Sequence, residues 1–488
     1  MNFCATRTVM AAALAALIST AATAADTQLA GKTQARASVT VFDTQGNKKT
    51  ATADDQGTYR VVVDGLSAPL MVVAEGANKQ FVAIVPALAN GAANTANANA
   101  LTDRIASDVA QEFKYAGPES MVKSGKAPAV KAESVSAKTA TLRTAIAQAL
   151  KEAGVTNPDG FDPVSAAAQP GLNDILSIVI HNRGYSSNTG ERGETSLYDP
   201  YYREITTFAP FSLKRAQADL KDLNAPGVIR VFVAGDSTAS NYDPEVAPRM
   251  GWGQVFDRKV KDSSKVRVIN VAQSGRSSRS FITEGWFDMI GANIRKGDYL
   301  LVQFGHNDEK CGNNPPSPPP SRDIIDTSNL CTYPGSEAAI PPDMSFQKTL
   351  EKYIKIAKDK GATPVLITPV TRRSFKGGTI GSTTHTYSKG AFPGDYSQTV
   401  RDTAKANNVA LIDLDAKSMA FYNKIGETGS LDYYLAVDTD KYPYYVGKTG
   451  ARNKPDNTHA QEQGAVALAT LIVEGIKEDK LDLANQLQ

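Results

Sequence analysis

The chain has 488 residues, of which 41% are hydrophobic and 21% are charged. This composition excludes a disordered chain and a fibre, and the length suggests about two or three domains. Lysine plus arginine total 53 and aspartate plus glutamate total 51, which gives a formal net charge of +2. We therefore expect no nucleic-acid partner, because dedicated nucleic-acid binders carry a strongly basic face.

Residues 1–24 have the pattern of a signal peptide. A single charge, Arg7, precedes an apolar run over residues 9–18, and Ala22-Thr23-Ala24 fits the A-x-A cleavage pattern. The apolar run is too short to span a bilayer, and no later segment has about 18 uninterrupted apolar residues. We expect a secreted or periplasmic protein without membrane insertion. A buried N-terminal helix is the weaker alternative.

Export determines which cysteines the mature chain keeps. Cleavage removes Cys4 and leaves Cys311 and Cys331, and two cysteines in an oxidising compartment predict a disulfide bond. It would close a loop of about 20 residues and stabilise the fold by on the order of 3 kcal/mol. The alternative is two separate buried thiols. The prolines between the cysteines favour an exposed loop and hence the bond; they are Pro315, Pro316, Pro318, Pro319 and Pro320.

The first part of the mature chain is rich in β-forming residues. Short runs at 38–42, 58–63 and 70–74 are separated by turn residues such as Asp55-Gln56-Gly57. Alternation with frequent turns predicts a small β-sandwich-like module over residues 25–90.

Residues 91–225 predict a helical and irregular connecting region. Apolar residues recur at three-to-four spacing over 103–113 and 138–153, which indicates two helices. No cluster of titratable residues stands out, and we interpret His181 as a structural histidine. This N-terminal region could bind a glycan or a protein, or serve as a spacer.

The pattern changes near residue 226. Five nearly continuous apolar runs predict parallel strands that are covered on both faces; they lie at 228–234, 266–272, 299–304, 363–368 and 409–414. Helical stretches at 345–360, 396–407 and 459–477 alternate with them. We therefore predict a three-layer α/β/α, flavodoxin-like domain with a parallel sheet over residues 226–488. Sites in this architecture lie at the carboxyl ends of the strands.

Four short motifs lie at those positions. Gly-Asp-Ser-Thr-Ala-Ser (235–240) ends the first strand, Gly-Arg-Ser-Ser-Arg-Ser (275–280) follows the second, and Gly-His-Asn-Asp (305–308) follows the third. Asp-Asn-Thr-His (456–459) precedes the last helix. Each motif alone is weak, but their order at the ends of successive strands makes coincidence improbable.

These motifs resemble those of the SGNH (GDSL-like) hydrolase superfamily, and more narrowly those of the rhamnogalacturonan/pectin acetylesterase family. The segment Thr-Pro-Val-Thr-Arg-Arg (368–373) adds to the second resemblance. The resemblance covers roughly residues 228–475 and implies a carbohydrate O-acetylesterase that needs no cofactor. It does not cover residues 26–225, and the proline-rich insertion at about 311–343 departs from compact members.

The residue types agree with ester hydrolysis, which needs a nucleophile, a base and an orienting carboxylate. Ser237 can be presented at the turn after the first strand, and no Gly-x-Ser-x-Gly elbow exists in the chain. His459 is the best base, and Asp456 can reach the other nitrogen of its ring. The alternative for Asp456 is a helix N-cap, which is compatible with the catalytic role.

An oxyanion hole is the remaining requirement. We assign its donors to the backbone N–H groups of Ser237 and Gly275 and to the side-chain amide of Asn307. His306 competes with His459 as base, but it precedes Asn307 and fits better as a residue that shapes the loop. The four histidines are dispersed and form no His-Glu-x-x-His pattern, so we expect no metal.

Cations follow the same strand ends. Arg276 and Arg279 flank the Gly275 turn, and Arg372 and Arg373 follow the fourth strand. A guanidinium can grip a carboxylate through two parallel hydrogen bonds, so these arginines are candidate binders of an acidic polysaccharide. The alternative is solvated surface or bracing of loops. Further candidates are Lys376 and Lys389 for charge, and Tyr442, Tyr444 and Tyr445 for stacking on sugars.

We therefore expect an exported serine esterase that removes O-acetyl groups from rhamnogalacturonan or homogalacturonan. One alternative keeps the chemistry but changes the substrate to acetylated xylan or a sialate-type ester. A second alternative is a non-catalytic glycan-binding envelope protein. Because all candidate catalytic groups follow residue 230, we also expect a chain that starts near Lys214 to hydrolyse a small ester.

Overall fold

The computed structural model describes residues 26–77, 79–185, 192–310, 330–332, 334, 345–381, 384–387 and 394–488. The expected signal peptide at 1–24 lies outside these ranges, as do Cys311, Lys389 and the prolines between the two cysteines. Within the described ranges, every helix is too short or too polar to cross a bilayer.

Seven strands at the start of the described chain form two sheets, with the orders β4-β1-β7 and β3-β2-β5-β6. The strands are β1 Gln28–Lys32, β2 Ser38–Phe42, β3 Lys48–Thr52, β4 Thr58–Val62, β5 Leu70–Glu75, β6 Gln80–Val85 and β7 Ala93–Thr95. Along β4, Tyr59 and Val61 are buried and their neighbours are exposed, the alternation of a strand with one solvated face. The two sheets share one apolar core. The three expected strands correspond to β2, β4 and β5.

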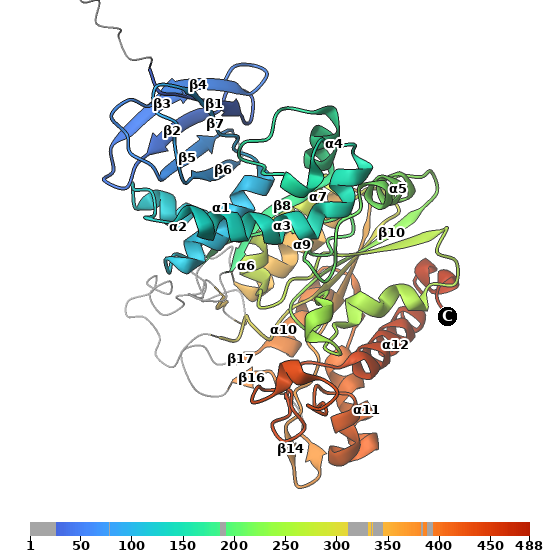
Figure 1. The fold of residues 1–488 in the computed structure, drawn as a ribbon. Helices are drawn as coiled ribbons and strands as arrows, with labels where there is room; N and C mark the ends of the chain where they lie inside the picture. The colour runs from blue at the N-terminus through green and yellow to red at the C-terminus, as the bar shows by residue number, and fades with distance from the viewer. Residues whose placement is uncertain are drawn as a thin grey trace, which may run out of the picture.

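Helices follow these sheets. Helix α1 (Ala100–Glu112) starts at a capping box in which the Asn99 side chain accepts from the Leu101 and Thr102 amides. Further helices are α2 Pro118–Lys123, α3 Ala132–Glu152, α4 Pro170–Ile178 and α5 Leu213–Leu223. The two expected helices correspond to α1 and α3, which pack on each other. Figure 1 shows the N-terminal sheets at one end of the molecule, with α1 and α3 between them and the α/β half.

An antiparallel hairpin, β8 (Ile180–Tyr185) and β9 (Arg192–Tyr198), joins the two halves. On one side it holds the buried carboxylate of Asp103 in α1, which bonds His181 Nε2 at 2.9 Å, Arg183 Nη2 at 2.7 Å and Thr195 Oγ1 at 2.8 Å. Burial alone would raise the pKa of Asp103, but the charges and hydrogen bonds of Arg183 and His181 hold it well below its usual range. His181 is therefore structural, as interpreted from the sequence.

The other side of the hairpin belongs to the core of the α/β half. The Tyr198 ring meets the Trp286 ring edge-on with 5.1 Å between centroids, and its hydroxyl donates to Gln273 Oε1 at 3.3 Å. Tyr202 packs in the same cluster. The expected boundary near residue 226 thus falls inside a packing unit, and a chain starting near Lys214 would lose both tyrosines from this core.

The central sheet has five parallel strands in the order β11-β10-β12-β13-β18. They are β10 Ile229–Gly235, β11 Val266–Asn270, β12 Tyr299–Gln303, β13 Thr363–Ile367 and β18 Ala410–Ile412. These are the five expected strands. Along β10, Val231 and Val233 face one apolar cluster, whereas Phe232 and Ala234 face another. Both faces are therefore buried, which explains the continuous apolar runs.

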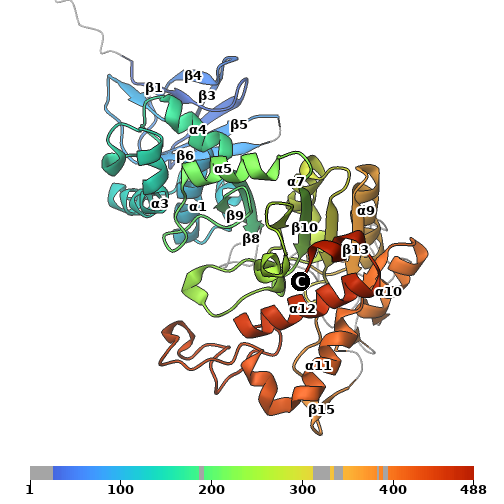
Figure 2. The same ribbon diagram turned by 90° about the vertical axis from the view of Figure 1, so that its right-hand side faces the viewer.

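Helices cover both faces and complete three layers. On the Phe232 face lie α6 Ser278–Thr283, α7 Trp286–Asn293, α9 Phe346–Asp359 and α10 Tyr396–Ala406. On the Val231 face lie the 3-10 segment η3 (Trp252–Lys259) and α12 (Glu462–Glu478), and α12 runs across the viewer's side of the sheet in Figure 2. Helix α11 (Leu414–Gly429) packs on α12, and two short hairpins are β14 Phe375–Lys376 with β15 Thr379–Ile380, and β16 Thr386–Tyr387 with β17 Gly394–Asp395.

Strand order positions the site. Because β10 lies between β11 and β12 and all three are parallel, the residues after them meet at one edge of the sheet. Ser237, Gly275 and Asn307 follow these three strands in turn. The sheet thus brings together motifs that are about 30 to 70 residues apart in the chain.

Candidate active site

Ser237 lies in a turn directly after β10. The Asp236 carboxylate accepts from the Thr238 amide at 2.9 Å, and the Asp236 carbonyl accepts from the amides of Ala239 and Ser240. The Tyr242 hydroxyl donates to the carbonyl of Ser237 at 2.7 Å. These bonds hold the backbone on both sides of the serine, so its side chain leaves the sheet edge in a fixed direction.

The three candidate catalytic side chains form one hydrogen-bonded chain. His459 Nε2 lies 2.9 Å from Ser237 Oγ, and His459 Nδ1 lies 2.8 Å from Asp456 Oδ2. The second oxygen of Asp456 accepts from the backbone amides of Thr458 and His459 at 2.7 and 3.0 Å. Asp456 therefore caps the local turn and orients the imidazole at the same time, as the sequence allowed.

The electrostatics suit a base. Burial opposes ionisation of Asp456, but hydrogen bonds from His459 and Thr458 lower its pKa to about 2. Burial is the main cause that lowers the pKa of His459, the Asp456 carboxylate opposes it, and the charge of Arg249 adds to it. His459 is consequently neutral near pH 7 with a proton on Nδ1, which leaves Nε2 free to accept the Ser237 proton.

The candidate oxyanion donors come from three adjacent loops. Gly275 has a φ of +80°, and nothing lies within 4 Å of a Cβ added there, so this position needs glycine and faces open space. Asn307 Nδ2 donates to the Arg276 carbonyl at 3.0 Å, which ties its loop to the Gly275 turn. Among the described residues, neither the Ser237 nor the Gly275 amide has an acceptor. These two amides are free to donate to a substrate oxygen.

Comparison with known proteins agrees with this geometry. The profile of the GDSL-like lipase/acylhydrolase family matches residues 233–464. The rhamnogalacturonan acetylesterase RhgT of Bacillus subtilis is 35% identical over 259 residues, which are 53% of this chain and 94% of that protein. The chain belongs to the GDSL-like lipase/acylhydrolase family. The family expected from the sequence motifs is thereby confirmed, and with it the assignment as an enzyme.

A second relative, the probable rhamnogalacturonan acetylesterase YesY of B. subtilis, is 33% identical and covers 53% of this chain and 96% of its own. Among solved structures, the protein YxiM of B. subtilis is 25% identical with a TM-score of 0.37, covering 52% of this chain and 58% of that chain. Each of the two acetylesterase matches covers about half of this chain and nearly all of the relative.

Arg276 and Arg279 are held by protein groups. Arg276 Nε pairs with the fully buried Glu284 at 2.9 Å, and its Nη1 donates to the Ser274 carbonyl at 2.6 Å. Arg279 is buried and donates to the Cys331 carbonyl at 3.1 Å. These contacts match the alternative given above, in which Arg276 and Arg279 brace the loops.

Arg372 and Arg373 also make internal contacts. Arg372 pairs with the buried Glu309 and donates to Thr458 Oγ1, so it links the Asn307 loop to the loop of Asp456 and His459. Arg373 donates to Ser430 Oγ at 2.9 Å and to the Glu427 carbonyl at 3.0 Å. Their role as substrate binders stays a prediction, but the contacts shown favour positioning.

The candidate stacking tyrosines differ in exposure. Tyr445 is buried, and its hydroxyl donates to the Val246 carbonyl. Tyr444 is 37% exposed, and Lys448 Nζ lies 3.5 Å from its ring centroid. Tyr442 is half-buried. Tyr444 is therefore the exposed ring of the three, and a lysine amine also lies near the Tyr442 ring, with Lys441 Nζ 5.2 Å from its centroid.

His306 does not contact the nucleophile. Its Nδ1 faces Asp236 Oδ2 at 3.3 Å, and burial lowers its pKa to about 4. Neighbouring His385 bonds Glu309 at 2.9 Å and the Val370 carbonyl at 2.8 Å; burial opposes its protonation, but Glu309 outweighs burial and raises its pKa. Both histidines shape the Asn307 loop, and His459 remains the base.

Sequence reasoning missed three residues at the site. Tyr242 holds the Ser237 carbonyl, and its place five residues after Ser237 was an available signal. Glu309 serves both Arg372 and His385, which lie 63 and 76 residues away, so no local pattern reveals it. Arg249 lies close enough to influence His459 but follows no strand end.

Cys331 is buried and its carbonyl receives Arg279. Cys311 lies outside the described residues, so the disulfide bond stays a prediction. Within the described ranges, no group of three or more histidine, cysteine or acidic side chains could hold a metal ion.

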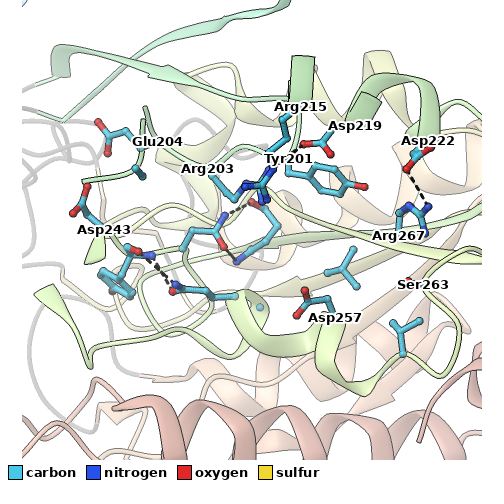
Figure 3. Close-up of a pocket in the computed structure, with 18 of the residues that line it drawn as sticks. Tyr201, Arg203, Glu204, Arg215, Asp219, Asp222, Asp243, Asp257, Ser263 and Arg267 are labelled. Carbon is cyan, nitrogen blue, oxygen red and sulfur yellow. Dashed lines mark hydrogen bonds and ion pairs between the residues drawn. The ribbon is translucent and has the colours of Figure 1, made fainter. Parts of the chain in front are cut away.

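A cavity of about 610 Å³ lies next to the catalytic turn, lined by Tyr242 but not by Ser237 or His459. Its charged side chains pair with one another (Figure 3): Arg203 with Asp219 at 3.1 Å, and Arg267 with Asp222 at 3.4 Å. These internal pairs leave few charges for a ligand, and the cavity is separate from the hydrogen-bonded chain of Ser237.

Proposed function

We propose that this chain is an exported serine esterase that removes O-acetyl groups from pectic polysaccharide, rhamnogalacturonan or homogalacturonan, through an acyl-enzyme. The observation that carries the proposal is the unbroken chain from Ser237 Oγ through His459 to Asp456 at the sheet edge. The names of the two B. subtilis relatives support the substrate class. The pattern of residues 1–24 supports export.

The geometry suits acyl transfer in two steps. Ser237 Oγ attacks the acetyl carbonyl carbon while His459 Nε2 takes its proton, and the carbonyl oxygen becomes an oxyanion. The Ser237 and Gly275 amides and the Asn307 amide group would stabilise that charge. The sugar oxygen then leaves with the proton from His459, and the acetyl group stays on Ser237. Water, deprotonated by His459, attacks the acetyl-serine and releases acetate.

Acetate release from acetylated rhamnogalacturonan, acetylated homogalacturonan and acetylated xylan tests the proposal. The wild type is expected to act on a pectic substrate, and Ser237→Ala is expected to lower the rate by about 10⁶-fold, because the serine and its base act as a unit. Circular dichroism of the variant should match the wild type. Retained activity in Ser237→Ala would overturn the mechanism, and release from xylan alone would overturn the pectic substrate.

A further inference from the structure

Arg249 differs from Arg276 and Arg372, because it has no acidic partner among the described residues. Arg276 and Arg372 each pair with a buried glutamate. Within the described ranges, Arg249 forms no ion pair, and its Nε is buried without a hydrogen-bond acceptor. A guanidinium that is partly desolvated and lacks a counter-ion is unfavourable. We therefore expect a function that offsets the cost of burying this charge without a counter-ion.

The backbone fixes Arg249 beside the base. Arg249 and Gln461 form an antiparallel bridge, and the next amide, that of Met250, donates to the Ala460 carbonyl at 3.1 Å. Ala460 follows His459 directly. The α-carbon of Arg249 is thus tied to the strand-like segment that carries the base, and its position relative to the reaction centre is set by main-chain bonds.

The Arg249 side chain packs on a tyrosine that contacts the backbone of the nucleophile. The guanidinium carbon lies 4.4 Å from the centre of the Tyr242 ring, and the hydroxyl of the same tyrosine bonds the Ser237 carbonyl. A cation over an aromatic face keeps its in-plane N–H groups available to an anion. The positive charge of Arg249 also acts on the base, because it lowers the pKa of His459.

A loop beside Arg249 adds features that suit a sugar acid. The Tyr445 hydroxyl donates to the Val246 carbonyl, so the segment around Tyr445 lies against the segment that leads to Arg249. The neighbouring Tyr444 is exposed, with the Lys448 amine over its ring. This side of the site thus combines cations with an open aromatic face.

We propose that Arg249 binds the carboxylate of an acidic sugar residue in the polysaccharide and thereby determines specificity. The inference rests on the proposed function. A bound carboxylate would supply the missing counter-ion and accept two parallel N–H bonds from the guanidinium. It would also cancel the positive charge that opposes protonation of His459 during the reaction. Arg276 and Arg372, which already have carboxylate partners, would act by positioning the loops.

The test compares Arg249→Gln with the wild type on two substrates. One is acetylated rhamnogalacturonan oligosaccharide with free carboxylates, and the other is the same oligosaccharide with its carboxylates converted to methyl esters. Charge-assisted hydrogen bonds predict that the ratio of kcat/KM, acidic over methyl-esterified, falls roughly tenfold to a hundredfold in the variant, mainly through KM. Added salt should shrink the difference between the enzymes, and Arg249→Lys should recover part of it.

Arg258→Gln is the matched control, because Arg258 is half exposed and pairs with Glu462 at the surface. Its substrate ratio should equal that of the wild type. An unchanged ratio in Arg249→Gln, or equal losses on both substrates, overturns the inference. Failure of the proposed function looks different, because the wild type itself would then release no acetate from either oligosaccharide.

The pH profile on a small neutral ester gives a second readout. Burial is the main cause that disfavours the His459 imidazolium; among the charged groups that act on it most strongly, Asp456 and Asp236 favour the imidazolium and Arg249 disfavours it. Removing this charge should raise the pKa of His459, so the acid limb of kcat/KM should move to higher pH in Arg249→Gln. An unmoved limb would mean that the guanidinium is too far from the base to share its site.

Discussion

Two of the aspartate–histidine pairs in the described residues have similar N···O distances but different uses. In the N-terminal half, Asp103 holds His181 at 2.9 Å, and at the sheet edge Asp456 holds His459 at 2.8 Å. Asp103 also takes Arg183, Thr195 and the Val82 amide, so its capacity to accept is filled by groups that lock the hairpin to α1 and β6. His181 meets the Phe81 ring edge-on. No serine is in its reach among its described hydrogen bonds.

In the second pair, Asp456 and His459, the surrounding polar groups are not all satisfied by protein partners, in contrast to the first pair. His459 turns its free nitrogen to Ser237 Oγ, and the amides of Ser237 and Gly275 have no acceptor among the described residues. Polar groups that are fully satisfied by protein partners stabilise a fold, whereas unsatisfied donors around an Asp–His pair leave room for a substrate. The comparison shows that an Asp–His pair alone does not make a catalytic site. What distinguishes the catalytic pair is the group that the histidine contacts with its other nitrogen, which for His459 is the Ser237 hydroxyl.

The largest expected effect is on the rate, at the catalytic pair. Asp456→Asn should lower kcat on a small acetate ester by about 10⁴-fold, because an amide can hold the imidazole in the wrong tautomer. Stability in urea should change little, since the asparagine oxygen can still accept the turn amides. A loss below tenfold would contradict the role of Asp456 in orienting the base.

The next effect is on stability, at the structural pair. Asp103→Ala should lower the free energy of unfolding by roughly 3–5 kcal/mol, because Arg183 loses the carboxylate that compensates its burial. Urea denaturation measures this loss, and Asp55→Ala, in the exposed pair with Arg36, is the control expected to change little. The folded fraction should keep its kcat on a small ester. A selective loss of kcat would make Asp103 part of the active site.

The smallest expected change concerns one oxyanion donor. Asn307→Ala should lower kcat by about 10²–10³-fold, which corresponds to ~2.7–4 kcal/mol of transition-state stabilisation. The bond to the Arg276 carbonyl is also lost, so the unfolding free energy should fall by only about 1 kcal/mol. Burst kinetics with a chromogenic acetate ester separate acylation from deacylation. If the loss of transition-state stabilisation were no larger than the loss of unfolding free energy, Asn307 would only support the loop structure.

The sequence predicts the α/β half well for a physical reason. Strands buried on both faces must be continuously apolar, so all five strands of the sheet are visible as runs. The motifs at their ends could then be placed together without coordinates, because parallel strands in a doubly wound sheet share a carboxyl edge. Ser237 is predicted on that basis, whereas Asp456 and His459 are predicted from the Asp-Asn-Thr-His motif before the last helix. The structure brings all three into hydrogen-bond contact.

The sequence could not show which arginines pair with internal carboxylates and which face the substrate side. Whether Arg276 or Arg372 faces solvent depends on Glu284 and Glu309, and Glu309 lies 63 residues from Arg372. The hairpin β8–β9 was missed because its polar residues His181, Arg183 and Thr195 point to Asp103. Polar side chains on a strand normally indicate solvent, and only a buried partner from another element reverses that interpretation.

The hydrogen bond between Ser237 and His459 joins residues 222 positions apart in the chain. The ribosome must add 222 residues after Ser237 before the base exists, so a chain that stops before His459 carries the serine as an ordinary alcohol. Helix α12, which begins three residues after His459 and packs on η3 next to the serine's turn, must also dock before the pair can meet. The nucleophilicity of Ser237 therefore depends on the docking of α12, and hydrolysis of a small ester reports that this helix is in place.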